Sequence, residues 1–247
     1  VEDHPYGWTV INGRNKYYAV FEFAEGTLLS DMLLKNPQPW YQHAGWIALT
    51  VADVILYLHK AQKLHLCLKP DVVLVRYDKE DIPRVMVLDL GVSEPGPQIP
   101  EKWDDSYNLP AYTAPEIISG RGPVSPATDV YGLGMLLYEM LAGHPAYTFH
   151  LQRDQFVYRD VLGGDYPATG RIDLKQIPQI AEKAIAPQPE ARFTNVPQFA
   201  QALAAMLPAI PAEKKPRTIN WRVVFIILGA LLAISLVLGL ALAVVPA

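Results

Sequence analysis

Apolar residues recur at helical spacing along residues 42–64 and predict one long amphipathic helix. Residues 128–142 are instead apolar nearly all round, which is typical of a helix in the centre of a domain. Gly143 and Pro145 follow this second run and are expected to end the helix. Shorter patterns predict further helices at residues 28–34, 174–186 and 196–207.

Runs rich in aromatic and β-branched residues predict three short strands. Residues 17–23 form the first run, which ends at a Glu-Gly turn. Residues 72–75 and 85–88 form the other two, and the charged turn between them predicts a hairpin. Residues 91–113 follow neither period and contain four prolines, so we expect a long irregular loop there. The fold class predicted is α+β and mostly helical.

The C-terminal part of the chain contains an uncharged apolar run over residues 223–245. About 20 apolar residues in a helix cross a hydrocarbon core of about 30 Å, so this run predicts one transmembrane helix. Four basic residues precede it and no charge follows, so the positive-inside rule places the preceding domain in the cytoplasm. These residues are Lys214, Lys215, Arg217 and Arg222. We therefore expect a domain over residues 1–207, a Pro-containing basic tether over 208–222, and a single-pass membrane anchor.

Composition narrows the class of partner and the compartment. The net charge is −4 and the basic residues are scattered, which argues against nucleic acid as a partner. Cys67 is the only cysteine, so no intrachain disulfide can form and a reducing compartment suits the chain. Because the chain opens on Val1 within what has the pattern of a folded segment, we interpret it as a piece of a longer protein.

Four short motifs follow one another in a fixed order along the chain. They are HLCLKP at residues 65–70, DLG at 89–91, APE at 114–116 and DVYGLG at 129–134. Together, in this order and spacing, they resemble the larger lobe of the serine/threonine protein kinase family. The resemblance runs from about Tyr17 to Leu207. It implies a protein-kinase-like fold made of the hinge and the larger lobe, with the smaller lobe largely absent from this chain.

The resemblance also identifies catalytic positions that carry other residues here. The family's loop reads H-R-D-L-K-P-x-N, in which the Asp accepts the substrate hydroxyl proton and the Asn holds magnesium. Cys67 stands at the Asp position and Val72 at the Asn position. A thiol with a pKa of about 8.5 is mostly neutral and a valine cannot bind a metal. Leu66 replaces the Arg that, in the family, pairs with a phosphate on the activation loop. Leu109 replaces a Thr that contacts the catalytic Asp and Lys.

Several functional positions of the family are retained. Lys69 matches the Lys that approaches the transferring phosphate, and Asp89 matches the Asp that binds magnesium. The resemblance places the backbone of Glu22 and Ala24 against an adenine, with Leu74 beneath its ring. Ordinary roles stay open for these residues, as a surface lysine, a turn aspartate or part of the core. No Gly-rich loop or partner lysine is found before them. If Val1 is the true start, we expect ATP and Mg²⁺ to bind weakly; in a longer protein, those parts would lie upstream of Val1.

Four more residues match the structural scaffold of the family. The resemblance implies that Glu116 and Arg192 form a buried ion pair, and that Asp129 braces the backbone around His65. Removing one partner of a buried pair is costly, so their presence indicates that the fold was kept while the chemistry was not.

We therefore expect a membrane-anchored, protein-kinase-like pseudokinase that acts as a signalling or scaffolding module with protein partners. One alternative is an active serine/threonine kinase that transfers phosphate from ATP by an altered mechanism. Another is a cytoplasmic module of a larger polypeptide whose enzyme activity lies elsewhere. Cys67 could also serve as a nucleophile, although only His65 lies close enough in sequence to activate it.

Overall fold

A computed structural model describes residues 6–20, 22–88, 109–121, 123–147, 154–174 and 176–213 of the chain. The chain divides into two compact units, Val1–Pro211 and Ala212–Ala247, and every element described below belongs to the first. Within the described ranges, none of the helices has both the length and the apolar character needed to cross a membrane. The run at residues 223–245 and the tether beyond residue 213 lie outside the described residues.

Helix α4 (Pro126–Ala142) lies at the centre of the first unit and is buried over nearly its whole length, as its apolar pattern predicts. The Ser125 hydroxyl accepts a hydrogen bond from the Ala127 amide, and the Thr128 hydroxyl accepts one from the Ser125 amide. This reciprocal arrangement is a capping box, which satisfies amide groups that the first helical turn leaves open. Gly143 ends the helix with a φ of 80°, a left-handed conformation that glycine adopts without strain.

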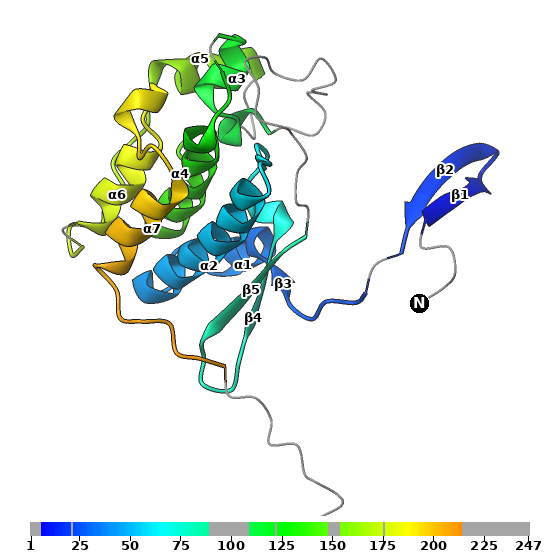
Figure 1. Cartoon of the computed structure of the whole chain (residues 1–247), viewed down its shortest axis with the longest axis horizontal. Helices are drawn as coiled ribbons and strands as arrows, with labels where there is room; N and C mark the ends of the chain where they lie inside the picture. The colour runs from blue at the N-terminus through cyan, green and yellow to red at the C-terminus, as the bar shows by residue number, and fades with distance from the viewer. Residues whose placement is uncertain are drawn as a thin grey trace, which may run out of the picture. The chain divides into compact units, whose positions relative to one another are not determined.

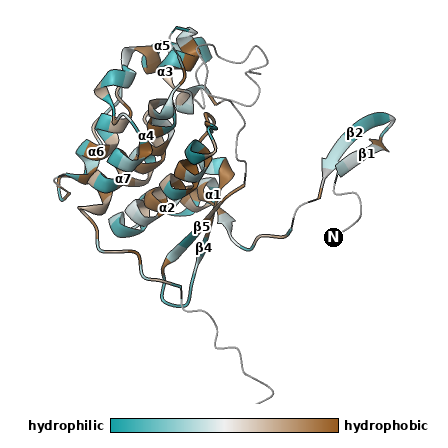
Figure 2. Cartoon of the chain, viewed as in Figure 1, coloured by the Kyte–Doolittle hydropathy of each residue, from teal (hydrophilic) through white to brown (hydrophobic). Residues whose placement is uncertain are grey.

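Three helices pack against α4: α2 (Tyr41–Lys60), α6 (Ile177–Ala184) and α7 (Val196–Ala204) (Figure 1). Close packing depends on two glycines of α4. A Cβ on Gly132 would lie 2.8 Å from the Leu68 side chain, and one on Gly134 would lie 2.6 Å from the Cβ of Ala184. Hydropathy changes from one side of α2 to the other in Figure 2, in agreement with the amphipathic pattern of its sequence.

The remaining helices are short. Helix α1 (Leu29–Lys35) follows the hinge segment, and α3 (Pro115–Ser119) packs against α5 (Asp154–Gly163). The sequence pattern did not predict α3 or α5. In α5 only Val157 and Val161 are buried, so its amphipathic stripe is too narrow to recognise in the sequence. Among the described residues, single turns of 3-10 helix lie at Pro70–Val72, Pro110–Tyr112 and Pro189–Ala191.

A small antiparallel sheet lies beside α2 and has the strand order β3 (Thr27–Leu28), β4 (Val73–Tyr77), β5 (Pro83–Val87). The predicted hairpin is therefore present, with Leu74 opposite Met86. Its turn is held by Asp78, whose carboxylate accepts hydrogen bonds from the amides of Glu80 and Ile82.

The N-terminal strand differs from the predicted one. Strand β1 (Tyr6–Ile11) and strand β2 (Arg14–Ala19) form a separate antiparallel hairpin, so the strand predicted at residues 17–23 begins earlier and ends earlier. Asn12 and Gly13 make the turn with φ angles of 52° and 74°. An Asn-Gly pair is a strong hairpin signal because both residues tolerate positive φ.

Candidate functional site

The backbone of the loop that follows α2 is fixed by Asp129 of α4. The fully buried Asp129 carboxylate accepts hydrogen bonds from the amide of His65 at 2.9 Å and from the amide of Leu66 at 2.7 Å. The Nε2 atom of His59 lies 2.7 Å from the same carboxylate. Asp129 thus braces the backbone around His65, the arrangement expected from the sequence.

The loop stores backbone strain at Leu66. This residue has a φ of 64°, in the left-handed region, which costs a residue with a Cβ roughly 1–2 kcal/mol. The hydrogen bond from its amide to Asp129 offsets that cost. The Leu66 side chain is buried in the core, so this position presents no cation to the solvent.

Cys67 is half-buried, and its amide donates a hydrogen bond of 3.3 Å to Nδ1 of His65. Nδ1 of His65 is therefore already the acceptor of a backbone hydrogen bond. This leaves His65 poorly placed to remove the thiol proton through Nδ1. In the part of the chain that the structure describes, no group of three His, Cys, Asp or Glu side chains is arranged to hold a metal ion.

Val72 is only 8% exposed and belongs to the hydrophobic core. Three residues earlier, Lys69 is half-buried on extended backbone. The Leu88 amide donates a 2.8 Å hydrogen bond to the carbonyl of Val72, so the end of β5 lies beside the loop. Asp89 follows Leu88 directly in sequence, but it lies outside the described residues.

The segment between β2 and β3 contains Glu22, which is exposed, and Ala24, which is half-buried. Leu74 is buried and lies on β4 between Val73 and Val75. Both valines enter the main core, so alternation along the strand places Leu74 on the opposite face. A Cβ on Gly26 would lie 2.8 Å from Cγ of Leu74, so the Leu74 side chain lies against Gly26, two residues after Ala24.

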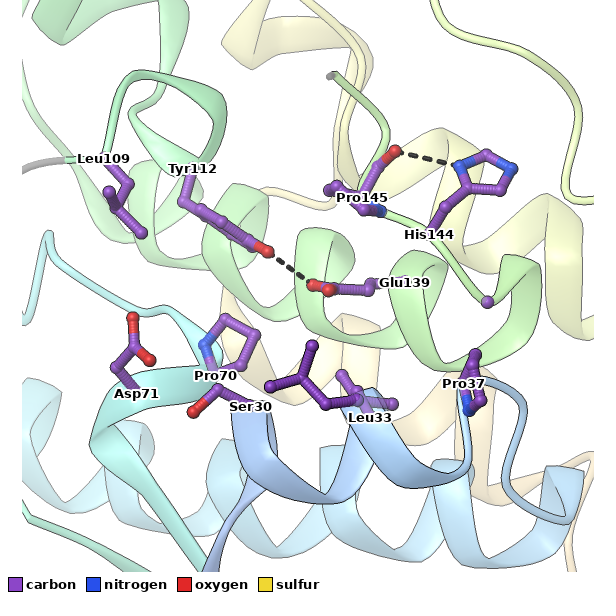
Figure 3. A pocket seen from close by; sticks show the side chains of 12 residues that line it. Ser30, Leu33, Pro37, Pro70, Asp71, Leu109, Tyr112, Glu139, His144 and Pro145 are labelled. Carbon is purple, nitrogen blue, oxygen red and sulfur yellow. Dashed lines mark hydrogen bonds between the residues drawn. The ribbon is translucent and has the colours of Figure 1, made fainter. Parts of the chain in front are cut away.

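A cavity of about 450 Å³ opens between α1, the 3-10 turn at Pro70–Val72, the 3-10 turn at Pro110–Tyr112 and the end of α4 (Figure 3). Most of its walls are apolar, and Leu109 is one of the residues that line it. Five of the lining side chains carry polar or ionisable groups: Ser30, Asp71, Tyr112, Glu139 and His144. The cavity thus joins an apolar wall to two carboxylates.

The polar groups of this cavity interact directly. The Tyr112 hydroxyl donates a 2.6 Å hydrogen bond to Oε2 of Glu139, and Figure 3 shows the two side chains pointing toward one another. Burial raises the pKa of Glu139; the bond from Tyr112 opposes that shift and the nearby charge of Asp71 adds to it. Burial also raises the pKa of Tyr112, which keeps it a neutral donor. A cationic group in the cavity would relieve the repulsion between the two carboxylates.

Sequence reasoning missed this cavity. Its signal was Glu139, which with Asp129 is one of two charged residues in the largely apolar run of residues 128–142, where a carboxylate shielded from solvent needs a partner. Its partner Tyr112 lies 27 residues earlier, so spacing alone could not connect them.

Glu116 and Arg192 form a buried pair away from this cavity. Nη1 of Arg192 lies 2.9 Å from Oε1 of Glu116, and Nη2 lies 2.7 Å from Oε2. The other guanidinium donors bind the carbonyl oxygens of Ala127, Ala186 and Pro187. All five donors of the guanidinium are therefore used. The pair expected from the sequence is present and ties α3 to the segment after α6.

Comparison with known proteins gives a family match over most of the chain. The model of the protein kinase domain matches residues 7–204. It includes the β1–β2 hairpin, so the likeness begins about ten residues before Tyr17, where the motifs placed its start.

Relatives among curated proteins are kinases of several kinds. The chain is 27% identical over 190 residues to calcium/calmodulin-dependent protein kinase type 1 of Caenorhabditis elegans, covering 72% of this chain and 50% of that protein. It is 31% identical over 163 residues to serine/threonine-protein kinase H2 of Homo sapiens, covering 65% and 41%. It is 29% identical over 192 residues to calcium-dependent protein kinase 13 of Arabidopsis thaliana, covering 73% and 34%. The chain spans half or less of the length of these relatives.

Proposed function

Because this chain belongs to the protein kinase family, we propose that it is a membrane-anchored, catalytically impaired kinase domain that binds a protein partner. The observation that carries the proposal is the burial of Val72 in the core beside a loop that presents Cys67. Phosphoryl transfer depends on positioning and charge stabilisation, and the family uses a carboxylate and an amide at these two positions. Neither side chain present here can take over those roles.

Nucleotide binding is proposed as weak. Members of the family use ATP with magnesium ions, which neutralise phosphate charge. Val72 offers no ligand atom and is turned into the core, so the donors present fit a metal only in part. Asp89 is the retained acidic ligand expected from the DLG motif, and Lys69 is the retained phosphate-facing cation. Leu74, on the face of β4 opposite the main core, would lie beneath the adenine.

The partner is proposed to present a basic side chain to the cavity between α1 and α4. Two carboxylates lie there, that of the half-buried Glu139 and that of the exposed Asp71, and the wall around them is mostly apolar. An Arg or Lys side chain matches both features, because its aliphatic stem can contact apolar surface while its charged end meets a carboxylate.

Membrane anchoring is proposed for residues 223–245, with the kinase domain on the cytoplasmic side. The support comes from the length and uncharged composition of the run and from the basic residues on one side of it. A tether of residues 208–222 would then connect the domain to the bilayer.

The experiment that tests impairment is incorporation of radiolabelled phosphate into the protein itself and into a generic basic substrate. Wild type, Asp89→Ala, Cys67→Asp, and the triple variant Cys67→Asp, Val72→Asn, Leu109→Thr are compared. We expect no incorporation above the Asp89→Ala background by wild type and little recovery in Cys67→Asp, because the losses act on one centre. Thermal midpoints accompany each assay, since Val72→Asn places an amide in the core. Robust incorporation by wild type that disappears in Asp89→Ala would establish an active kinase and overturn the proposal.

A further inference from the structure

An aromatic cluster lies where α2 begins. Trp40 is 53% exposed, and its ring centroid lies 6.0 Å from that of Tyr41, 5.0 Å from that of His43 and 6.4 Å from that of Trp46. His43 and Trp46 are buried beneath it. None of these four residues lines the cavity that contains Glu139, although Pro37 of that cavity lies three residues before Trp40, and the proposed function does not use the cluster.

Other large apolar side chains are exposed at the same end of the domain. Ile172 is 97% exposed and Met206 is 38% exposed. Tyr41, Leu174 and Met206 line one shallow cavity, which places the loop of Ile172 beside the start of α2. A single exposed apolar residue is ordinary, but several at one end of a domain are typical of a contact surface.

The chain leaves the domain at this end. Nε1 of Trp46 donates a 2.9 Å hydrogen bond to the carbonyl of Pro208, and Leu207 packs directly against Gly45. Figure 1 shows the first turn of α2 beside the last turn of α7, in the lower left of the view. The start of the tether is therefore fixed to the aromatic cluster.

Chain length limits how far this end can lie from the bilayer. Fourteen residues lie between Pro208 and Val223. A flexible chain of that length spans about 20 Å on average and at most about 50 Å. A domain of about 200 residues has a diameter of roughly 40 Å, so its opposite end would approach the bilayer only if the tether were almost fully extended.

We propose that this end of the domain, the exit face formed by Trp40, Tyr41, Ile172 and Met206, rests on the headgroup region of the bilayer. The inference depends on the membrane anchoring in the proposed function. Trp and Tyr favour the membrane interface because each combines an apolar ring with a polar atom. Ile172 and Met206 provide apolar contacts beside them.

Electrostatics are removed from the test by the choice of lipid. Burial lowers the pKa of His43, and the carboxylate of Asp81 is close enough to oppose that shift. A carboxylate near the exit face would be repelled by anionic lipid, whereas the basic tether would be attracted. Vesicles of zwitterionic phosphatidylcholine neither repel the carboxylate nor attract the basic tether, so binding to them depends on the apolar contact alone.

The experiment uses the full chain with Cys67→Ala and a single new cysteine, Ile172→Cys, labelled with a polarity-sensitive dye. The labelled protein is reconstituted in phosphatidylcholine vesicles with and without bromine atoms on the acyl chains. We expect a blue-shifted emission that loses most of its intensity in the brominated vesicles. The matched control is the dye at Arg121→Cys, an exposed site after α3, for which we expect neither effect.

Each other result has a defined meaning. Adding Trp40→Ser to the Ile172-labelled chain should reduce the quenching while the protein stays with the vesicles. Equal quenching at both sites, or no quenching at Ile172, would show that the exit face does not rest on the bilayer. Neither result would contradict the membrane anchor. Quenching that grows with protein density and ignores bromine means that a second copy covers this face, which also overturns the proposal. A chain that stays in the aqueous fraction overturns the membrane anchor and, with it, this inference.

Discussion

Arg192 and Glu116 are joined by two parallel hydrogen bonds of 2.9 and 2.7 Å in a site from which both side chains are excluded from solvent. Nη1 also binds the carbonyl of Ala127, in the first turn of α4. The guanidinium carbon lies 4.9 Å from the centre of the Tyr131 ring, which adds a cation–π contact. One side chain thus joins α3, α4 and the segment after α6.

We predict that Glu116→Ala lowers the free energy of unfolding by about 3–5 kcal/mol, because it leaves an uncompensated buried cation. Urea unfolding measures the change. Arg171 and Asp173 provide the matched control, since they also share two hydrogen bonds, each of 2.8 Å, but at the surface. Asp173→Ala should leave the midpoint nearly unchanged because exposed pairs contribute little. Equal effects of the two substitutions would show that burial is not the cause.

Asp129→Asn should lower the free energy of unfolding by roughly 3 kcal/mol. An amide has one acceptor oxygen, so one of the two loop amides loses its partner, and each buried donor left unsatisfied costs about 1–3 kcal/mol. Hydrogen exchange at the His65 and Leu66 amides should accelerate at the same time. Asp53→Asn, on the exposed side of α2, serves as the control. Unaltered exchange at both amides would contradict the bracing role of Asp129.

Glu139 should give the domain a specific pH dependence. Burial raises its pKa in the folded protein, so the folded state binds more protons than the unfolded state between the two pKa values. Stability associated with this group is full below the ordinary Glu pKa and is lost as the pH rises through the raised value. Glu139→Gln should therefore stabilise the protein at pH 7, by about 1.4 kcal/mol per unit of pKa shift, and the gain should vanish near pH 4.

The hydrogen bond from Tyr112 allows an independent check of that pH dependence. Tyr112→Phe removes the donor that opposes the rise in the pKa of Glu139. It should destabilise the protein more at pH 7 than at pH 4, in thermal unfolding measured at both values. A loss that is the same at both pH values would mean that the carboxylate is not ionised in the folded domain.

Binding of a basic peptide should depend on both carboxylates of the cavity. A charged hydrogen bond contributes about 1.5–3 kcal/mol, so Asp71→Asn and Glu139→Gln should each weaken binding about tenfold or more. Titration calorimetry with an Arg-containing peptide and its Gln-containing counterpart measures this. Glu190→Gln, an exposed carboxylate outside the cavity, is the control. Affinity that does not distinguish the two peptides would remove the cavity from the proposed function.

Truncation after Pro216 should release the protein from the membrane fraction, because it removes the whole apolar run. Protease added to intact cells should spare the kinase domain of the full chain if that domain is cytoplasmic. A truncated protein that still sediments with membranes, or digestion from outside, would contradict the anchor or its orientation.

Sequence-based prediction succeeded for the elements whose local structure follows directly from their own residue pattern. The central helix could be predicted because its residues are apolar on every side, and α2 because its apolar face repeats. The pair of Glu116 and Arg192, 76 residues apart, was reached only through the family motifs. The bond between Tyr112 and Glu139 was not predicted, because it depends on where a proline-rich segment returns to α4. The β1–β2 hairpin does not follow from the aromatic run alone, because the turn at Asn12 and Gly13, which lies before that run, sets the ends of both strands.

Burial of Val72 also limits how this protein can evolve. Substitution by Asn would insert an unpartnered amide into a packed core, at a cost of about 1–3 kcal/mol. Under the proposed function, neither Val72→Asn nor Cys67→Asp brings a benefit without the other. Selection acting on one substitution at a time would then meet a valley on each path toward a catalytic domain.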